Sequence, residues 1–272
     1  MEPTAHHTCH VVEAGRVQAA ERDLLVEEPL LIQQGDTSLV TLMRTPGHEI
    51  ELAIGYLLTE GLIRSMSDLG AVSFCSAEGG QPNVVRVTPA AGRALAAPDR
   101  YRAIFSSCSL CGKEALDELA REVPAFERDP ARLTALGIAE MGRVMRERQA
   151  WFRATGASHA AGLALRPLDR ASLDAMIVRE DIGRHNALDK AAGAALARGM
   201  DLRRGVLFLS GRLSLEMVAK AARAGIRDVA GVSAPTSLAV DLARRLGMFL
   251  AGFARGESFT IYAGAEALRE DS

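Results

Sequence analysis

The chain has 272 residues, 48% of them hydrophobic, and its 32 basic and 34 acidic side chains give a net charge of -2. A chain of this length and apolar content buries one large core or two modest ones, so intrinsic disorder is excluded as the default state. The balanced charge supplies no overall field that would attract nucleic acid or an anionic membrane. Any anionic ligand must therefore be held by a local site.

Features of membrane and secreted proteins are missing from the sequence pattern. No run approaches the roughly 20 apolar residues that a membrane-spanning helix needs. The start, Met1 to His10, is polar and is expected to be loose, and it lacks the charged and then apolar pattern of a leader. Of the four cysteines, Cys9 and Cys75 stand alone, so no disulfide framework is expected. These features predict a cytoplasmic protein.

The first part of the chain predicts a small α+β domain at residues 20–125. A Thr45-Pro46-Gly47 turn separates a short apolar strand from a stretch with apolar residues at helical spacing. A charged, proline-bounded linker is expected at residues 124–130. The expected elements are strands at 39–44, 71–75 and 83–88, a helix from Ile50 to Leu58, and a helix at 114–122.

The remainder predicts an α/β domain at residues 135–272. A helix with Met141, Val144, Met145, Arg148 and Phe152 on one stripe opens it, and that stripe indicates packing. Short apolar runs then alternate with amphipathic helices, which favours βαβ units and a largely parallel sheet. The expected strands are 162–165, 175–179, 206–209, 228–232, 248–253 and 259–262, with helices starting at 186, 214 and 236.

Cys108 and Cys111 are the only paired cysteines, in the stretch Ser-Ser-Cys-Ser-Leu-Cys-Gly-Lys. A thiol acts as nucleophile or metal ligand only as thiolate, and small polar neighbours with a following lysine favour that form and leave the sulfur accessible. Gly112 permits backbone conformations that a side chain would forbid. The pattern predicts sulfur chemistry on a mobile, exposed loop.

Three loops of the second domain are polar at the point where a strand ends and a helix begins. They are residues 180–186, 210–212 and 233–237. Open α/β sheets bind ligands at this edge, where helix N-termini offer free N–H groups and a positive dipole end. Arg184 and Arg212 add forked donors suited to phosphate. Ordinary helix capping is the more frequent explanation of any single loop, but three such loops on consecutive units, two with an arginine at the helix start, favour an anion site. His185 and His159 remain open between structural and ligand roles.

Six segments in this order resemble the formate dehydrogenase accessory sulfurtransferases, the FdhD family, over about residues 25–265. The segments are ELAIGYLLTEGLI at 51–63, CSLCGKE at 108–114, TGASHAAGL at 155–163, EDIGRHNALDK at 180–190, SGRLSLEMVAKAARAGI at 210–226 and SAPTSLAVDLA at 233–243. A single CxxC is a weak signal, but the ordered set is highly specific.

The resemblance implies a cytoplasmic sulfur carrier. It takes persulfide sulfur from a cysteine desulfurase and passes it to the molybdenum bis(molybdopterin guanine dinucleotide) cofactor before that cofactor enters formate dehydrogenase. Guanine nucleotides such as GDP are expected to mimic the cofactor. The implied fold of the second half is a cytidine deaminase-like, three-layer α/β/α domain, and the implied assembly is a homodimer.

The resemblance also implies site residues. Cys108 is the expected persulfide carrier, and Cys111 assists it, either by forming a disulfide that releases sulfur or by lowering the pKa of its neighbour. The implied cofactor-binding segment is Phe259, Thr260, Ile261, Tyr262, Ala263 and Gly264. Tyr262 is either a guanine-stacking residue or part of the core. Arg184 and Arg212 are expected to hold the cofactor's pyrophosphates.

Four other interpretations were weighed. A structural zinc site needs a second pair of ligands besides the two cysteines, and the sequence has no second CxxC. Its only closely spaced histidines are His6, His7 and His10, in the N-terminal segment that is expected to be loose. A zinc deaminase needs an H-x-E and P-C-x-x-C signature, which the sequence lacks. A thioredoxin-like oxidoreductase would place its CxxC early in a βαβ unit, whereas the α/β half here lies downstream. A chaperone that holds the cofactor without moving sulfur cannot be separated from a transferase by sequence.

Overall fold

The computed structural model describes residues 2–75, 83–92, 95, 112–127, 129–130 and 132–269, and of residues 112–115 it describes the backbone alone. Cys108 and Cys111 lie outside these ranges. Among the described residues, no helix has the length and apolar character needed to cross a membrane.

A six-stranded sheet lies at the centre, in the order β12-β11-β10-β9-β7-β8. Strands β9, β10 and β11 are parallel, whereas β7 runs antiparallel to both its neighbours and β12 runs antiparallel to β11. The expectation of a largely parallel sheet is therefore wrong toward both edges. Its strands are β7 (His159–Leu165), β8 (Ile177–Asp181), β9 (Gly205–Leu209), β10 (Asp228–Gly231), β11 (Phe249–Arg255) and β12 (Ser258–Ala263).

The physical reason is the length of the connections. A parallel neighbour needs a crossover of about a dozen residues or more, usually with a full helix. Between β7 and β8 the chain forms only the five-residue helix α6 (Arg170–Asp174), and β11 reaches β12 through a two-residue turn. Short links of this kind return the chain antiparallel.

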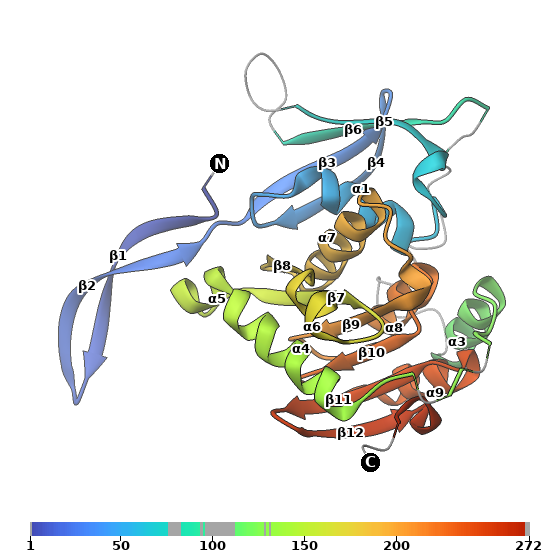
Figure 1. Cartoon of the computed structure of the whole chain (residues 1–272). Helices are drawn as coiled ribbons and strands as arrows, with labels where there is room; N and C mark the ends of the chain where they lie inside the picture. The colour runs from blue at the N-terminus through green and yellow to red at the C-terminus, as the bar shows by residue number, and fades with distance from the viewer. Residues whose placement is uncertain are drawn as a thin grey trace.

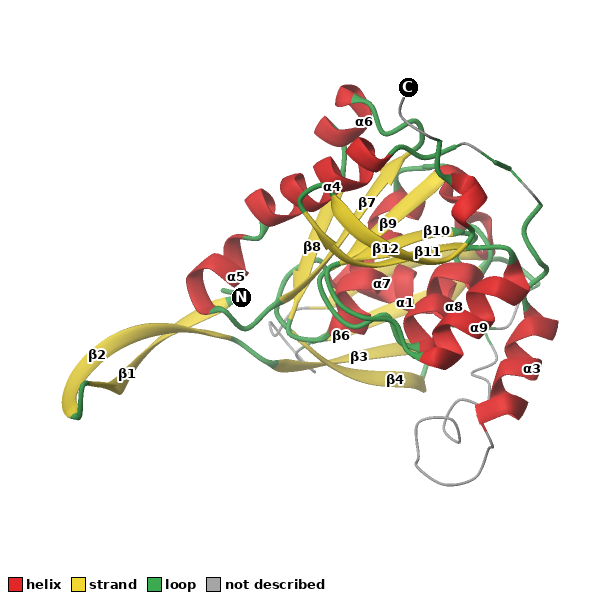
Figure 2. Ribbon diagram, turned by 90° about the horizontal axis from the view of Figure 1, so that it is seen from below, coloured by secondary structure: helices red, strands yellow, loops and turns green. Residues whose placement is uncertain are grey.

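Helices cover both faces of the sheet, so the predicted α/β class with three layers is confirmed (Figure 2). Every residue of β9 is buried, with Leu207 and Leu209 on one face and Val206 and Phe208 on the other. The first face packs against α7 (Arg184–Ala197), α8 (Leu215–Arg223) and α9 (Ser237–Leu246). The second packs against α4 (Ala135–Arg148).

A four-stranded sheet stands above α7, separated from it by helix α1 (Glu49–Thr59) (Figure 1). Apolar residues of this sheet, such as Leu30 and Val85, share one core with Leu52 and Leu57 of α1 and with the first face of the central sheet. The strand order is β4 (Thr37–Arg44), β3 (Glu28–Gln34), β6 (Val84–Pro89) and β5 (Leu69–Cys75). The N-terminal α+β arrangement predicted from the sequence is thus present.

The expectation of a loose N-terminus is wrong. Strands β1 (Thr4–Glu13) and β2 (Arg16–Leu25) form an antiparallel hairpin that projects from the body (Figure 1). Its residues are too polar to mark a buried strand, and its turn at Ala14 and Gly15 uses positive φ angles at both positions. The hairpin is held by backbone pairing between its strands and not by apolar burial, so a pattern of apolar residues could not predict it.

The helix expected to run as far as Phe152 breaks at Gln149, giving α4 and the short α5 (Ala150–Thr155). Met141 and Met145 are buried as predicted, but Phe152 is 48% exposed. The other elements are helix α3 (Gly112–Glu122) and the 3-10 turns Met66–Asp68, Leu202–Arg204 and Ala265–Ala267.

Candidate functional site

The candidate site lies where the chain enters α7 and α8, at the end of the central sheet where β8 and β9 finish. Antiparallel β7 begins at this same end, so His159 stands beside the loops at 182–184 and 210–214. Four side chains with basic nitrogens gather in this way. We call Arg184, Arg212, His159 and His185 the basic rim.

Gly211 fits between two members of the rim. A Cβ at this position would lie 3.4 Å from Cβ and Cδ of Arg184 and 3.4 Å from Nδ1 of His159. Ser210 anchors the same corner, because its Oγ accepts the Ala160 N–H at 2.8 Å and lies 3.5 Å from His159 Nδ1. Backbone without a side chain thus brings the arginine and the histidine together.

The electrostatics of the rim are those of crowded cations. Burial lowers the pKa of His159, and the charges of Arg184 and Arg212 lower it further. Both effects favour the neutral form of His159 at neutral pH. An anion bound here would relieve this repulsion.

A carboxylate beside the basic rim, that of Glu216, offsets part of the rim's positive charge. Glu216 Oε2 lies 3.2 Å from His185 Nε2 and 3.9 Å from Arg184 Nη2. The hydrogen bond from His185 lowers the pKa of Glu216, against the opposing effect of burial. Arg184 Nε is buried and, within the described part of the chain, has no hydrogen-bond partner. The donor set therefore fits a phosphate or pyrophosphate, with one donor still to be satisfied.

The alternative of ordinary capping holds for one of the three loops. Thr236 caps α9 by accepting the Ala239 N–H at 3.4 Å. The N-cap residues of the other two helices make no such bond: Gly183 of α7 has no side chain, and the Ser214 side chain accepts no N–H of the first turn of α8. The first turn of α7 also carries Arg184 where an acidic residue would suit the helix dipole. Ordinary N-capping therefore does not account for the loops at 180–186 and 210–212, and they remain candidates for an anion site.

In the ranges that the structure describes, no three His, Cys, Asp or Glu side chains gather in a way that could hold a metal ion. Cys108 and Cys111 lie outside these ranges, so the zinc interpretation of the cysteine pair is a separate question.

Comparison with known proteins decides the family. The model of the FdhD/NarQ family matches residues 25–269. The chain belongs to the FdhD/NarQ family. It is 43% identical over 252 residues to a Corynebacterium efficiens protein called sulfur carrier protein FdhD, covering 89% of each chain. It is 41% identical over 277 residues to the Mycolicibacterium paratuberculosis protein of the same name, covering 98% of this chain and 100% of that one.

A solved structure supports the fold of this FdhD/NarQ protein. A crystal structure from Desulfotalea psychrophila, described as a formate dehydrogenase accessory protein, superposes with a TM-score of 0.77. It covers 98% of this chain and 100% of that chain at 22% sequence identity. At this identity the likeness concerns the fold.

The cysteine motif of this family member directly precedes a docked helix. Cys108 and Cys111 lie outside the described residues, but α3 begins at Gly112. Leu116 and Leu119 of α3 are buried in the main core, and Asp117 pairs with Arg245 of α9. The chain after the motif is therefore anchored on the α9 side of the central sheet.

Residues 259–263 of the implied cofactor-binding segment lie in edge strand β12, and Gly264 follows that strand. The side chains of the segment are divided between two environments. Phe259 and Ile261 pack on the core that faces α4, as expected of structural residues. Tyr262 points to the other side, where its Cε2 lies 3.3 Å from the position of a Gly252 Cβ. Gly264 has φ +70° and sits against the Met248 carbonyl. Thr260 and Tyr262 are the side chains of this segment available to a ligand on the helix side or in solvent.

The sequence analysis did not single out two residues of this region, Phe253 on β11 and Glu216 beside the basic rim. Phe253 has φ +53°, a left-handed conformation that is rare for a bulky residue, and is 46% exposed. Its N–H bonds to the carbonyl of Ser233, in the loop after β10. Glu216 was the other residue missed. Nothing in the pattern marks either one, because Phe253 sits in an apolar run and Glu216 in an amphipathic helix.

Proposed function

We propose that this protein carries sulfur as a persulfide on Cys108, from a cysteine desulfurase to molybdenum bis(molybdopterin guanine dinucleotide), before that cofactor enters formate dehydrogenase. The same proposal includes a cytoplasmic location, where free thiols persist, and a homodimeric assembly. The observation that carries it is the family membership, together with the CxxC motif at residues 108–111. Relatives in this family are named sulfur carrier protein FdhD.

The basic rim supports the acceptor half of the proposal. The cofactor brings two pyrophosphates and two guanines, and a chain with a net charge of -2 needs local cations to hold them. Arg184 and Arg212 provide forked donors, and the uncapped start of α7 provides N–H groups. Exposed Phe253 offers an aromatic face on which a guanine stacks.

The first chemical step is an exchange between sulfurs. The Cys108 thiolate attacks the terminal sulfur of the desulfurase persulfide, and the S–S bond of that persulfide breaks. The desulfurase cysteine leaves as a thiolate, and Cys108 becomes a persulfide. No electrons are lost or gained overall, so no external oxidant is needed.

The second step passes the terminal sulfur to the cofactor as substrate. If Cys111 attacks the inner sulfur, a Cys108–Cys111 disulfide forms and the terminal sulfur leaves with two electrons, at the level of sulfide. Alternatively, Cys111 only lowers the pKa of Cys108, and the acceptor attacks the terminal sulfur with its own electron pair. The S–S bond then breaks, the terminal sulfur stays on the acceptor, and Cys108 leaves as a thiolate. We favour an assisting role for Cys111 in either form.

Mass spectrometry of the intact protein tests the carrier step. After incubation with a cysteine desulfurase and cysteine, the protein should gain about 32 Da, reversed by reductant. Cys108→Ser should gain nothing and should fail to activate formate dehydrogenase, whereas Cys75→Ser, a matched loss of a lone cysteine, should behave as wild type. A Cys108→Ser protein that still activates formate dehydrogenase would exclude the proposal.

The same measurement separates the alternatives. A protein that binds GDP but gains no sulfur under these conditions would be a cofactor chaperone. A protein that retains one zinc ion in native mass spectra, lost in Cys108→Ser, would be a zinc protein. Persulfide, disulfide and zinc change the mass by different amounts.

A further inference from the structure

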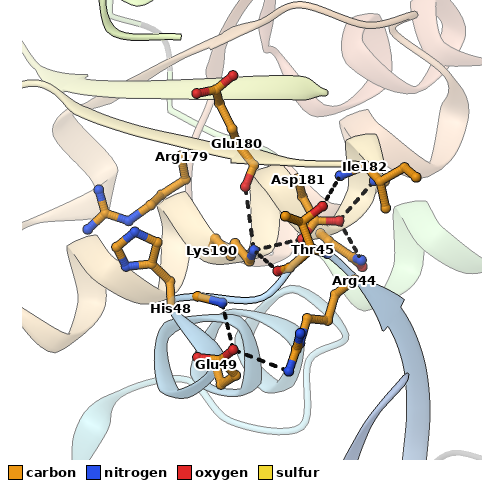
Figure 3. A network of polar contacts seen from close by, with 12 residues as sticks. Arg44, Thr45, His48, Glu49, Arg179, Glu180, Asp181, Ile182 and Lys190 are labelled. Atoms are coloured by element: carbon orange, nitrogen blue, oxygen red, sulfur yellow. Dashed lines mark hydrogen bonds and ion pairs between the residues drawn. The ribbon is translucent and has the colours of Figure 1, made fainter. Parts of the chain in front are cut away.

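The strongest unused feature of the molecule is a fully buried ion pair next to the rim. Lys190 Nζ lies 2.7 Å from Asp181 Oδ2, and both side chains have no exposed surface (Figure 3). Replacing such pairs by apolar residues is often neutral or stabilising, because desolvation of the two charges opposes their attraction. Stability alone is therefore a weak reason for this pair.

Asp181 uses both of its oxygens to hold the start of α7. Oδ1 accepts the Gly183 N–H at 2.9 Å and the Asn186 Nδ2–H at 3.0 Å. Oδ2 accepts the Thr45 N–H at 3.2 Å and binds Lys190. The contacts of Oδ1 fall on either side of Arg184 and His185, so the carboxylate determines where these two rim residues stand.

Thr45, at the end of β4, is the fixed point on the other side. Its carbonyl accepts from Lys190 Nζ at 2.9 Å, and its Oγ1 accepts the Ile182 N–H at 3.2 Å (Figure 3). Asn186 adds a bond to the Met43 carbonyl at 2.7 Å. The loop at 182–186 is thus attached to the four-stranded sheet through side chains and backbone together.

We propose that Asp181, Lys190 and Thr45 are positioning residues that hold Arg184 and His185 in anion-binding geometry. None of the three forms part of the rim itself. They act through the loop at 182–186, whose position depends on the junction between β4 and α1. The assignment rests on the proposed function for its ligand, but the positioning itself is independent of which anion binds.

A second ion pair provides the matched control. Arg179, two residues before Asp181 on β8, pairs with Glu51 of α1, with 2.5 Å between Nε and Oε2, and so ties β8 to the helix that follows the β4–α1 junction. That pair lies away from the rim and bonds to no residue of the 182–186 loop in the described structure. Each pair ends on β8 and lies between β8 and the part of the chain around Thr45 and α1, but only loss of the Asp181–Lys190 pair should affect the rim.

The experiment compares the Asp181→Asn/Lys190→Met double variant with Glu51→Gln/Arg179→Met. Amide hydrogen exchange is measured on the full chain at residues 182–187, and GDP binding by calorimetry well below the unfolding temperature. We expect exchange in this segment to accelerate at least tenfold, and GDP affinity to fall about tenfold, in the first double variant only. Equal exchange at 182–187 in wild type and both variants would overturn the proposal.

A conservative pair covers the case in which the double variant does not fold. Thr45→Ser keeps the hydroxyl that accepts the Ile182 N–H and should retain slow exchange at 182–187, whereas Thr45→Val, close in volume, should lose it. Identical exchange in both Thr45 variants would contradict the positioning role. Failure of wild-type protein to bind GDP would instead remove the proposed cofactor site and leave the exchange result to judge the positioning residues.

Discussion

Gly55 of α1 lies so close to Asp189 of α7 that a Cβ at position 55 would stand 1.7 Å from the Asp189 carbonyl oxygen. The contact is reciprocal, because a Cβ at Gly193 would stand 1.9 Å from the Glu51 carbonyl oxygen. Two glycines thus let the helix backbones touch. This crossing sets the distance between the four-stranded sheet and the central sheet.

Gly55→Ala and Gly193→Ala should each be strongly destabilising, because the clash is with backbone that cannot rotate away. We expect a loss of at least about 2–3 kcal/mol in the free energy of unfolding, measured by denaturant titration. Ala197→Gly, at an exposed position near the end of α7, is the control and should cost at most about 1 kcal/mol. A Gly55→Ala protein as stable as wild type would show that the helices can separate freely.

Removal of either rim arginine should weaken GDP binding. Hydrogen bonds from charged donors contribute about 1.5–3 kcal/mol, so Arg184→Ala and Arg212→Ala should each lower the affinity by roughly tenfold or more. The dependence of the affinity on salt should also become shallower, since fewer cations contact the phosphates. Arg203→Ala removes an exposed arginine from the opposite end of the sheet and should leave binding unchanged. Equal losses in all three variants would point to a general charge effect instead of a local site.

Neutralising Glu216 should have the opposite sign. The carboxylate lies against His185 and Arg184, so Glu216→Gln should free these donors and strengthen GDP binding several-fold. Glu147→Gln, at an exposed position of helix α4 across the sheet, serves as the control for the change in net charge. Weaker binding in Glu216→Gln would mean that the carboxylate orients the rim more than it competes with the anion.

His159 makes the site sensitive to pH. Its pKa lies below the ordinary value of 6.5, through burial and the neighbouring Arg184 and Arg212. The unfolded chain therefore takes up a proton before the folded protein does, and the stability contributed by neutral His159 is lost as the pH falls below about 6.5. A bound anion raises the pKa of His159 again, so GDP should raise the unfolding temperature more at pH 6 than at pH 8.

Thermal unfolding with and without GDP, in wild type and His159→Gln, measures this coupling. The variant should show a smaller difference in the GDP effect between the two pH values. The terminal phosphate of GDP also takes up a proton between pH 6 and pH 8. The test is therefore the difference between wild type and His159→Gln, and not the wild-type curve alone.

The sequence indicated part of the rim because its arginines follow strands. Arg184 and Arg212 each stand just after an apolar run and before a helix, and strand ends of an α/β sheet meet at one edge. The spacing of Cys108 and Cys111 indicated sulfur chemistry, and the family resemblance added the expected role of Cys108 as sulfur carrier. The match over residues 25–269 confirms that resemblance. Glu216, Phe253 and the Asp181–Lys190 pair carry no such local signal. Their roles depend on what stands opposite them in space.

Local patterns in the chain determined the α/β class, most of the helices and strands, and the loops that carry the two arginines, since apolar periodicity and turn residues act over a few positions. Tertiary structure alone decided the direction of β7 and β12, the projecting hairpin, and the glycine contact between α1 and α7. It also decided that Thr45 meets Asp181, 136 positions away. Contacts between residues so far apart in the sequence depend on how whole layers pack, so the residues next to them in the sequence do not predict them.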